Sequence, residues 1–346
     1  MKHLCDFSSW CGACLLAPIA GWARNSSRDL RVYVQPDNLT ALIEQPTVCA
    51  PPAPLLLLVV VCSAVINFEA RQAVRDTWGS PSNVSDNTIR LAFLLGATES
   101  EELQSRVESE SALYGDIIQE GFLDTYNNLT LKSVMLLKWV RSHCRHARYV
   151  MKTDDDMFVN LGRLVTQLRA DVARFRPPTS LSPSSESDKL PDYAKEPRGL
   201  LLGALICGAR PIANTRSKWY APRYMYAERT YPNYLSGTGY VMSADVVLRL
   251  FNAALHTPLF HLEDVYITGM CAKAAGLRPR DHPGFSYQRR KLEPCAYRNS
   301  LITSHRLNST DLRQVWQRIQ APDLQCPVTT VASKVRKGGR SSKACV

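Results

Sequence analysis

The chain has 346 residues, 45% of them apolar, which is typical of a globular protein with one large domain or two ordinary ones. Its formal net charge is +11, and basic residues crowd the end of the chain beside Gly and Ser, so we expect 326–346 to be a basic disordered tail. The sequence contains neither a basic stretch interleaved with aromatic residues nor a nucleic-acid-binding module, and we therefore expect no nucleic acid among its partners.

Residues 1–52 have the composition of an N-terminal anchor and stem. The stretch 7–23 is uncharged and lies between Lys2 and Arg24, which makes it a candidate signal anchor. It is short, because a membrane-spanning helix needs about 20 apolar residues. A proline-rich spacer at 50–54 separates this segment from the rest of the chain.

Five N-glycosylation acceptor patterns and eleven cysteines favour the secretory pathway, where disulfides persist. The patterns begin at Asn25, Asn38, Asn83, Asn128 and Asn308. Cys271 and Cys295 flank a predicted helix and loop, and they are the best candidates for a disulfide.

Strands and helices alternate from residue 55 onward. Hydrophobic patterns predict strands at 55–62, 89–95, 147–151 and 200–206, with a short extended piece at 116–120. They predict helices at 70–78, 101–113, 131–142, 161–175, 244–255, 263–276 and 311–320, with Ser243 and Ser309 as two of the N-caps. Such alternation indicates an α/β fold with a mixed, largely parallel sheet and helices on both faces. We expect a single catalytic domain over 53–325, with a mobile loop at 177–199.

Three consecutive carboxylates, Asp154, Asp155 and Asp156, follow a predicted buried strand. Like charges at a strand end repel one another unless a cation neutralises them. Mn²⁺ and Mg²⁺ prefer carboxylate oxygen and bind diphosphate at the same time. The sequence therefore predicts a metal site for a diphosphate-bearing substrate. The alternative, an acidic solvated turn, is disfavoured because Phe158 and Val159 resume the apolar pattern at once.

Seven short motifs follow one another along the chain. They are RQAVRDTWG at 71–79, FLLG at 93–96, YNNLTLK at 126–132, KTDDDMFVN at 152–160, KWY at 218–220, YPNYLSGTGY at 231–240 and EDVY at 263–266. With these motifs the chain resembles the β-1,3-glycosyltransferases, most closely their β-1,3-galactosyltransferase branch, over most of its length after residue 55.

The resemblance implies a GT-A type (Rossmann-like) fold, a UDP-galactose donor, dependence on Mn²⁺ or Mg²⁺, and inversion at the anomeric carbon. It implies transfer to the 3-hydroxyl of an acceptor sugar on a glycoprotein or glycolipid. It also implies a single-pass type II protein of the Golgi membrane with a lumenal catalytic domain.

The resemblance assigns the metal to three residues. Asp156 is the expected direct ligand, Asp154 is a second candidate, and a late histidine of the family matches His305, with His282 as the alternative. Asp154 and Asp155 are also expected to contact the donor ribose or its bound waters.

The resemblance also points to Asp264, next to Glu263, as the catalytic base. A carboxylate at a predicted helix start is kept anionic by the helix dipole, and it can accept a proton late in the reaction. Alternatively, Glu263 and Asp264 only cap this helix.

Further residues are candidates for donor binding. Arg71 and Arg75 lie four residues apart on one helical face and suit an anionic partner, although surface salt bridges are an equal alternative. Lys218 and Trp219 are expected near a sugar. The small residues Gly237 and Gly239 allow the backbone to approach a ligand closely. Trp78 and Trp139 are assigned to the core.

The chain departs from the family pattern at two places. The stretch 267–271 after the expected base is one residue longer than the common form. The family's cysteine before Ser236 is Leu235 here, so Cys144 lacks that partner, and Cys207 becomes a candidate.

Three other functions remain open on the sequence. They are a β-1,3-N-acetylglucosaminyltransferase of the same fold, an inactive glycan-binding relative, and a metal-dependent phosphohydrolase or nuclease. The phosphohydrolase and nuclease do not need the motifs at 237–240 and 263–266, and the intact acids disfavour an inactive relative.

Overall fold

The computed structural model describes residues 18–50, 55–80, 88–174, 198–327 and 345, with backbone alone over 171–174. The strands are β1 (Ala41–Ile43), β2 (Leu57–Cys62), β3 (Ile89–Ala97), β4 (Ile117–Leu123), β5 (Tyr149–Asp154), β6 (Phe158–Val159), β7 (Leu201–Ile206), β8 (Tyr234–Ser243), β9 (Arg280–Asp281) and β10 (Thr303–Ser304).

The α-helices are α1 (Arg31–Val34), α2 (Phe68–Asp76), α4 (Glu101–Tyr114), α5 (Leu129–His143), α6 (Leu161–Arg174), α7 (Ala244–Ala254), α8 (Ala272–Ala274), α9 (Pro294–Asn299) and α10 (Ser309–Gln320). Two 3₁₀ turns, η2 (Pro46–Cys49) and η3 (Tyr126–Asn128), and one π-helix, η6 (Val265–Cys271), complete the described elements. The predicted cap at Ser309 is wrong, because the Asn308 side chain accepts the hydrogen bond from the Asp311 amide.

Eight strands form one sheet in the order β1-β4-β3-β2-β5-β8-β7-β9. Strands β4, β3, β2 and β5 run parallel, whereas β8 is antiparallel to both β5 and β7. The chain moves outward from β2 to β3 and β4 and then returns to place β5 on the other side of β2. The predicted mixed sheet is confirmed, and its topological switch point, where open α/β sheets bind ligands, lies between the ends of β2 and β5.

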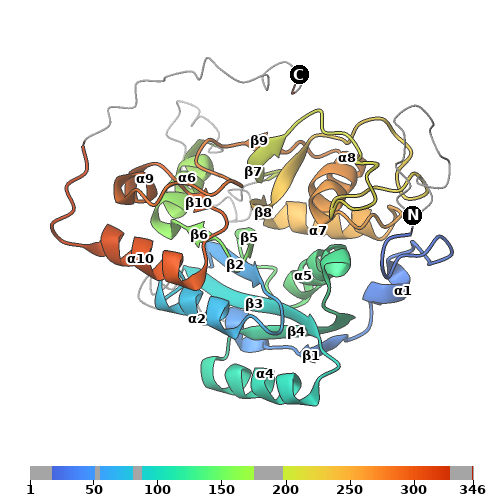
Figure 1. The fold of residues 1–346 in the computed structure, drawn as a ribbon, viewed down its shortest axis with the longest axis horizontal. Helices are drawn as coiled ribbons and strands as arrows, with labels where there is room; N and C mark the ends of the chain where they lie inside the picture. Colours follow the sequence, from blue (N-terminus) through green and yellow to red (C-terminus); the bar gives the residue numbers. More distant parts are fainter. Residues whose placement is uncertain (1–17, 51–54, 81–87, 175–197, 328–344, 346) are drawn as a thin grey trace, which may run out of the picture.

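Helices cover both faces of the sheet, and strand β2 shows why its sequence is continuously apolar. Leu58, Val60 and Cys62 point toward the core layer that contains α5 and α7 residues. The alternate positions point toward the layer with residues of α2, α6 and α10, and Figure 1 shows these helices on opposite sides of the sheet. Because both faces of β2 are buried, apolar and polar residues do not alternate along this strand.

The segment that the sequence predicts as a stem is packed on the sheet over residues 18–50. Trp22 is 3% exposed and belongs to the core, and β1 pairs antiparallel with β4. Residues 7–17 of the candidate anchor lie outside the described residues, whereas Ile19 and Trp22 form a β-bridge. None of the helices in the described ranges has both the length and the apolar character that a bilayer crossing needs.

Three disulfides within the described part of the chain join segments that are distant in sequence, and none is a predicted pair. They are Cys49–Cys144, Cys207–Cys345 and Cys295–Cys326. The predicted pairs Cys271–Cys295 and Cys144–Cys207 are wrong; Cys271 is a buried free thiol. Each true partner comes from the N-terminal segment or the tail, which the sequence does not place near the sheet. Most of the predicted loop 177–199 and of the tail lies outside the described residues.

A buried ion-pair network fastens helix α2 to helix α4. The Arg71 guanidinium, with no exposed surface, donates to both oxygens of Glu110, the shortest contact being 2.6 Å. Arg75 donates to Glu110 at 2.7 Å and to Asp116 at 2.8 Å. Both arginines form buried ion pairs, and not the surface salt bridges that the sequence left as an alternative. Because carboxylates already occupy both guanidinium groups, direct donor contact by Arg71 and Arg75 does not fit this arrangement.

Replacement of Glu110 by Gln should destabilise the fold strongly, because two buried guanidinium groups then lose their shared counter-charge. We expect a loss of about 3–5 kcal/mol in the free energy of unfolding, measured by urea denaturation. The matched control is Glu108→Gln on the exposed side of the same helix, which should change stability by less than about 0.5 kcal/mol. Equal small effects of both substitutions would contradict a stabilising role for the network.

Candidate active site

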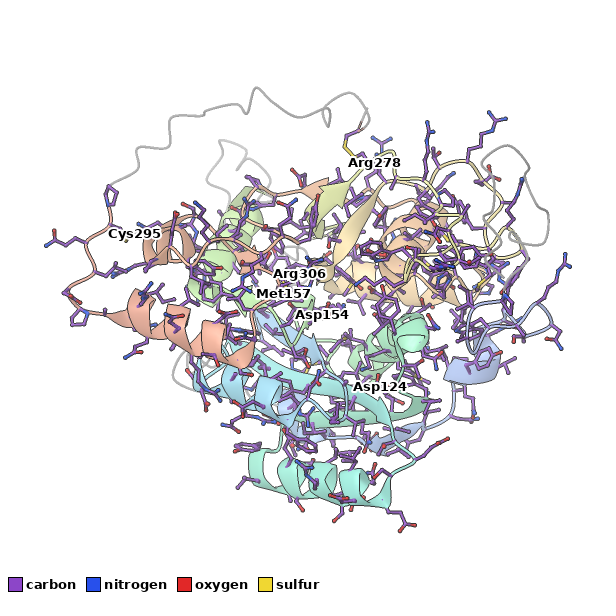
Figure 2. All side chains as sticks on the ribbon, in the orientation of Figure 1. Asp124, Asp154, Met157, Arg278, Cys295 and Arg306 are labelled. Carbon is purple, nitrogen blue, oxygen red and sulfur yellow. A yellow bond between two sulfur atoms is a disulfide. The ribbon has the colours of Figure 1, made fainter. Side chains whose placement is uncertain are left out.

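The acid cluster lies at the switch point, where β5 ends at Asp154 and β2 ends at Cys62. One oxygen of Asp155 accepts hydrogen bonds from the Ser63 hydroxyl (2.6 Å) and from the Asn67 amide (2.9 Å). Burial raises the pKa of Asp155, and these two donors offset part of that effect. The connection after β2 therefore orients the middle acid. In Figure 2, Asp154, Met157 and Arg306 are labelled near the middle of the view.

Lys152 is the buried cation of this cluster, a role that the sequence patterns did not predict. Its ammonium donates to Asp154 Oδ1 and to the Gly237 carbonyl, both at 2.6 Å, and lies 3.9 Å from Glu263 Oε2. Burial lowers the pKa of Lys152, but the charges of Asp154 and Glu263 outweigh burial and raise it. Lys152 thus stays charged and occupies one oxygen of Asp154. The feature of the sequence that could have indicated this role is a lysine within an otherwise apolar strand.

Asp156 and His305 form the pair of side chains best suited to a metal ion. Strands β6 and β10 pair antiparallel and bring His305 Nε2 to 3.1 Å from Asp156 Oδ2. The other ring nitrogen of His305 lies 2.9 Å from the Tyr287 carbonyl. That carbonyl can only accept, so Nδ1 carries the proton, and in the neutral ring Nε2 presents its lone pair. Burial lowers the pKa of His305, but its hydrogen bond to Asp156 and the charge of Asp156 raise it further than burial lowers it.

This donor set fits a metal that arrives with a diphosphate. Within the described ranges no three His, Cys, Asp or Glu side chains converge on one point. Magnesium-type ions, however, are commonly held by one or two protein carboxylates together with substrate phosphates. Asp156 and His305 meet that requirement, whereas one oxygen of Asp154 is taken by Lys152. His282 accepts from the Gly284 amide within its own turn.

Two adjacent carboxylates occupy different environments at the start of η6. Glu263 is 7% exposed, and its Oε1 accepts from Ser133 Oγ and from the Tyr240 hydroxyl, both at 2.8 Å. Asp264 is half-buried and accepts from the Val265 amide at 2.9 Å. Burial raises the pKa of Asp264, which brings it closer to the range of an effective base. Glu263 is therefore a fixed internal group, and Asp264 is the one open to a ligand.

The two glycines of the motif at 237–240 differ in what surrounds them. A Cβ on Gly237 would lie 2.7 Å from Glu263 Oε2 and 3.2 Å from the Asp264 Cβ. A Cβ on Gly239 would meet only ordinary contacts of 3.4 Å. The small size of Gly237 thus accommodates the two acids, a reason different from the predicted approach of a ligand.

The helix after Asp264 is a π-helix, which the sequence analysis treated as regular. Buried Thr268 donates its hydroxyl to the Asp264 carbonyl at 2.6 Å and accepts from the Leu235 amide at 2.9 Å. A π-helix takes one more residue per turn than an α-helix, and η6 contains the stretch that is one residue longer than the family form. Thr268 ties this turn to β8.

A cavity of about 330 Å³ opens at the ends of β2, β3 and β4. It is lined by Ala64, Val65, Ile66, Ala97, Thr98, Glu99, Ser100, Leu103, Leu123 and Asp124. The buried Lys132 ammonium bridges Asp124 (2.7 Å) and the Ser63 carbonyl (2.8 Å), which links the cavity wall to the residue that holds Asp155. The sequence predicted none of these lining residues, because three separate segments, 64–66, 97–103 and 123–124, form the cavity together.

The remaining predicted residues are also placed. Lys218 and Trp219 lie on the connection between β7 and β8, with the Lys218 ammonium 4.9 Å from the Trp219 ring centroid. Trp78 and Trp139 are buried, which confirms their assignment to the core.

Comparisons with known proteins identify the family of this chain. The family model described as Galactosyltransferase matches residues 69–181 and 190–283. Beta-1,3-galactosyltransferase 1 of Homo sapiens is 37% identical over 283 residues, covering 82% of this chain and 79% of that protein. N-acetyllactosaminide beta-1,3-N-acetylglucosaminyltransferase 2 of Mus musculus is 34% identical over 307 residues, covering 86% of this chain and 71% of that protein.

A third relative, beta-1,3-galactosyltransferase 2 of Homo sapiens, is 37% identical over 284 residues, covering 81% of this chain and 62% of that protein. Among solved structures, the apo structure of the bifunctional glycosyltransferase WbbM matches with a TM-score of 0.40 and 11% identity, over 77% of this chain and half of that one. The family match and the identity to these relatives show that the chain belongs to the galactosyltransferase family, among the β-1,3-galactosyltransferases and their β-1,3-N-acetylglucosaminyltransferase relatives.

Proposed function

We propose that this chain transfers galactose from UDP-galactose to the 3-hydroxyl of an acceptor sugar, with inversion at the anomeric carbon. The observation that carries the proposal is that a candidate metal site and a candidate base lie close together at the switch point of the sheet. Asp156 and His305 lie 3.1 Å apart and are suited to hold a metal ion, and half-buried Asp264 faces the same cluster through Gly237 and Lys152. A sugar nucleotide needs both groups, one at its diphosphate and one at the attacking hydroxyl.

The donor fits between the cavity and the acid cluster. In this proposal the uridine occupies the 330 Å³ cavity at the ends of β2 and β3. Asp155, held by Ser63 and Asn67, faces the ribose. A divalent cation, Mn²⁺ or Mg²⁺, held by Asp156 and His305 would neutralise the charge that develops on the UDP leaving group.

Asp264 takes the proton from the acceptor hydroxyl as that oxygen attacks the anomeric carbon. Its pKa, raised by burial, makes it a stronger base than an exposed aspartate. Glu263 and Lys152 hold the residues around Asp264 in place, because Glu263 accepts hydrogen bonds from Ser133 and Tyr240. These groups position Asp264 rather than exchange protons with the acceptor.

Galactose is the preferred donor because two of the named relatives are galactosyltransferases at 37% identity. The N-acetylglucosaminyltransferase relative at 34% identity makes UDP-N-acetylglucosamine the second candidate. Parallel assays with both donors, manganese and acceptors ending in N-acetylglucosamine, N-acetylgalactosamine or galactose test the proposal. Absence of transfer from either donor would favour an inactive glycan-binding relative.

We further propose residence in the Golgi membrane as a type II protein, with the lumenal domain acting on glycoproteins or glycolipids.

Asp264→Asn should abolish most turnover while leaving donor binding intact, because an amide cannot accept the proton. We expect kcat to fall by about a hundredfold or more, measured by UDP release in the presence of acceptor. The control is Asp323→Asn at an exposed position, which should retain normal kcat. A near-normal kcat in the Asp264 variant would remove this residue from the role of base.

His305→Ala should weaken manganese-linked binding of UDP, because the metal loses one of its two protein ligands. We expect at least about a tenfold loss of affinity in isothermal titration calorimetry with manganese present. His282→Ala is the matched control and should bind UDP as the parent chain does. The opposite pattern would move the ligand assignment to His282, and manganese-independent binding by the parent chain would contradict the metal site.

A further inference from the structure

Two exposed aromatic side chains stand beside the carboxylates of the site, on segments far apart in sequence. Tyr126 begins η3 between β4 and α5, and Trp219 lies on the β7–β8 connection. Their exposed fractions are 45% and 47%, whereas Trp78 and Trp139 are buried. Large aromatic surfaces that remain in contact with water next to a functional site often mark a binding surface.

The two aromatic side chains form one unit. The Lys218 ammonium lies 5.5 Å from the Tyr126 ring centroid and 4.9 Å from the Trp219 ring centroid, within cation–π range of both rings. We call these three residues the aromatic platform.

Both supporting segments are anchored by hydrogen bonds. The Asn127 carbonyl accepts from Trp22 Nε1 at 2.9 Å, and the Asn127 amide donates to the Ala20 carbonyl at 3.0 Å. On the other side, the Tyr220 amide donates to the Ser217 carbonyl at 3.0 Å and closes a turn around Trp219. The platform is therefore preformed, and the N-terminal segment contributes directly to its support.

The platform borders the Asp264 side of the site, because η3 leads directly into α5 and α5 bonds the segment that ends at Asp264. Thr130 Oγ1 donates to the Phe260 carbonyl at 2.7 Å, and Ser133 Oγ donates to Glu263 Oε1 at 2.8 Å. Burial raises the pKa of Tyr126 to about 12, and the charge of Asp264 acts in the same direction, in keeping with this placement. Burial and the charge of Asp264 also raise the pKa of Tyr234. The cavity at the ends of β2 and β3, in contrast, includes no platform residue.

We propose that Lys218, Tyr126 and Trp219 form the acceptor subsite, on which the apolar C–H face of a terminal pyranose of the acceptor glycan stacks. The proposal rests on the proposed function, because an acceptor hydroxyl has to reach Asp264. A pyranose presents C–H groups on one face and hydroxyls around its rim. An aromatic platform takes the face and leaves a rim hydroxyl directed at the neighbouring carboxylate. Lys218 and Trp219 are thereby assigned to acceptor binding, whereas the sequence made them candidates for donor binding.

The test compares Trp219→Ala, Trp219→Phe and Tyr126→Phe in the full chain with the parent. We expect Trp219→Ala to raise the acceptor KM about tenfold or more, while the donor KM and the slow hydrolysis of the donor to water stay unchanged. Trp219→Phe keeps a ring and should recover most of the affinity. Tyr126→Phe keeps the ring face and should change the acceptor KM by less than about twofold. Leu113→Ala, at an exposed position on α4, is the control with normal kinetics.

A donor KM that rises with an unchanged acceptor KM would overturn the proposal and return Trp219 to the donor. Unchanged kinetics in all three variants would overturn it as well. Saturation-transfer NMR with the β-methyl glycosides of N-acetylglucosamine, N-acetylgalactosamine and galactose gives a readout that needs no turnover. Glycoside binding lost in Trp219→Ala supports the platform even if the parent chain transfers no sugar, an outcome that would contradict only the proposed function. Equal binding by parent and variant, or no glycoside binding by the parent, would contradict the platform.

Discussion

The contact of the Lys152 ammonium with Asp154 and the Gly237 carbonyl is the interaction on which the site depends. It places one positive charge among carboxylates that would otherwise repel one another in a poorly solvated space. It also joins β5 to β8, so the acids at the end of β5 and those at the start of η6 belong to one rigid unit. Glu263, 3.9 Å from the same ammonium, extends that unit to the start of η6.

Much of the fold was predictable from local patterns. Strand β2 is continuously apolar because helices cover both of its sides, and the motif acids follow β5 as expected for ligand groups at strand ends. The pairing of Asp156 with His305 was available only through the family resemblance, because the β6–β10 contact joins segments about 150 residues apart and leaves no local pattern.

The errors came from interactions whose partners lie outside any local window. Residues 18–50 look like a stem by composition, yet Trp22 and Cys49 are fixed by the Asn127 carbonyl and by Cys144. Arg71 suits a phosphate chemically, but Glu110, which occupies it, lies on another helix. Lys152 was missed because sequence patterns do not show whether a lysine next to acids reaches solvent; its ammonium instead turns inward to Gly237.

The wide turn at Val265–Cys271 lets the chain hold an extra residue next to Asp264 without displacing it. The surplus is absorbed inside the helix, while Asp264 stays anchored through its carbonyl to Thr268. Each residue advances an α-helix by about 100°, so an extra residue in a regular helix would rotate every later side chain by that angle. Because the wide turn takes up the extra residue, the side chains beyond it keep their facing. A shorter form of this stretch must therefore be matched to the chain with a gap inside the turn, or inward-facing and outward-facing side chains will be confused along the rest of the helix.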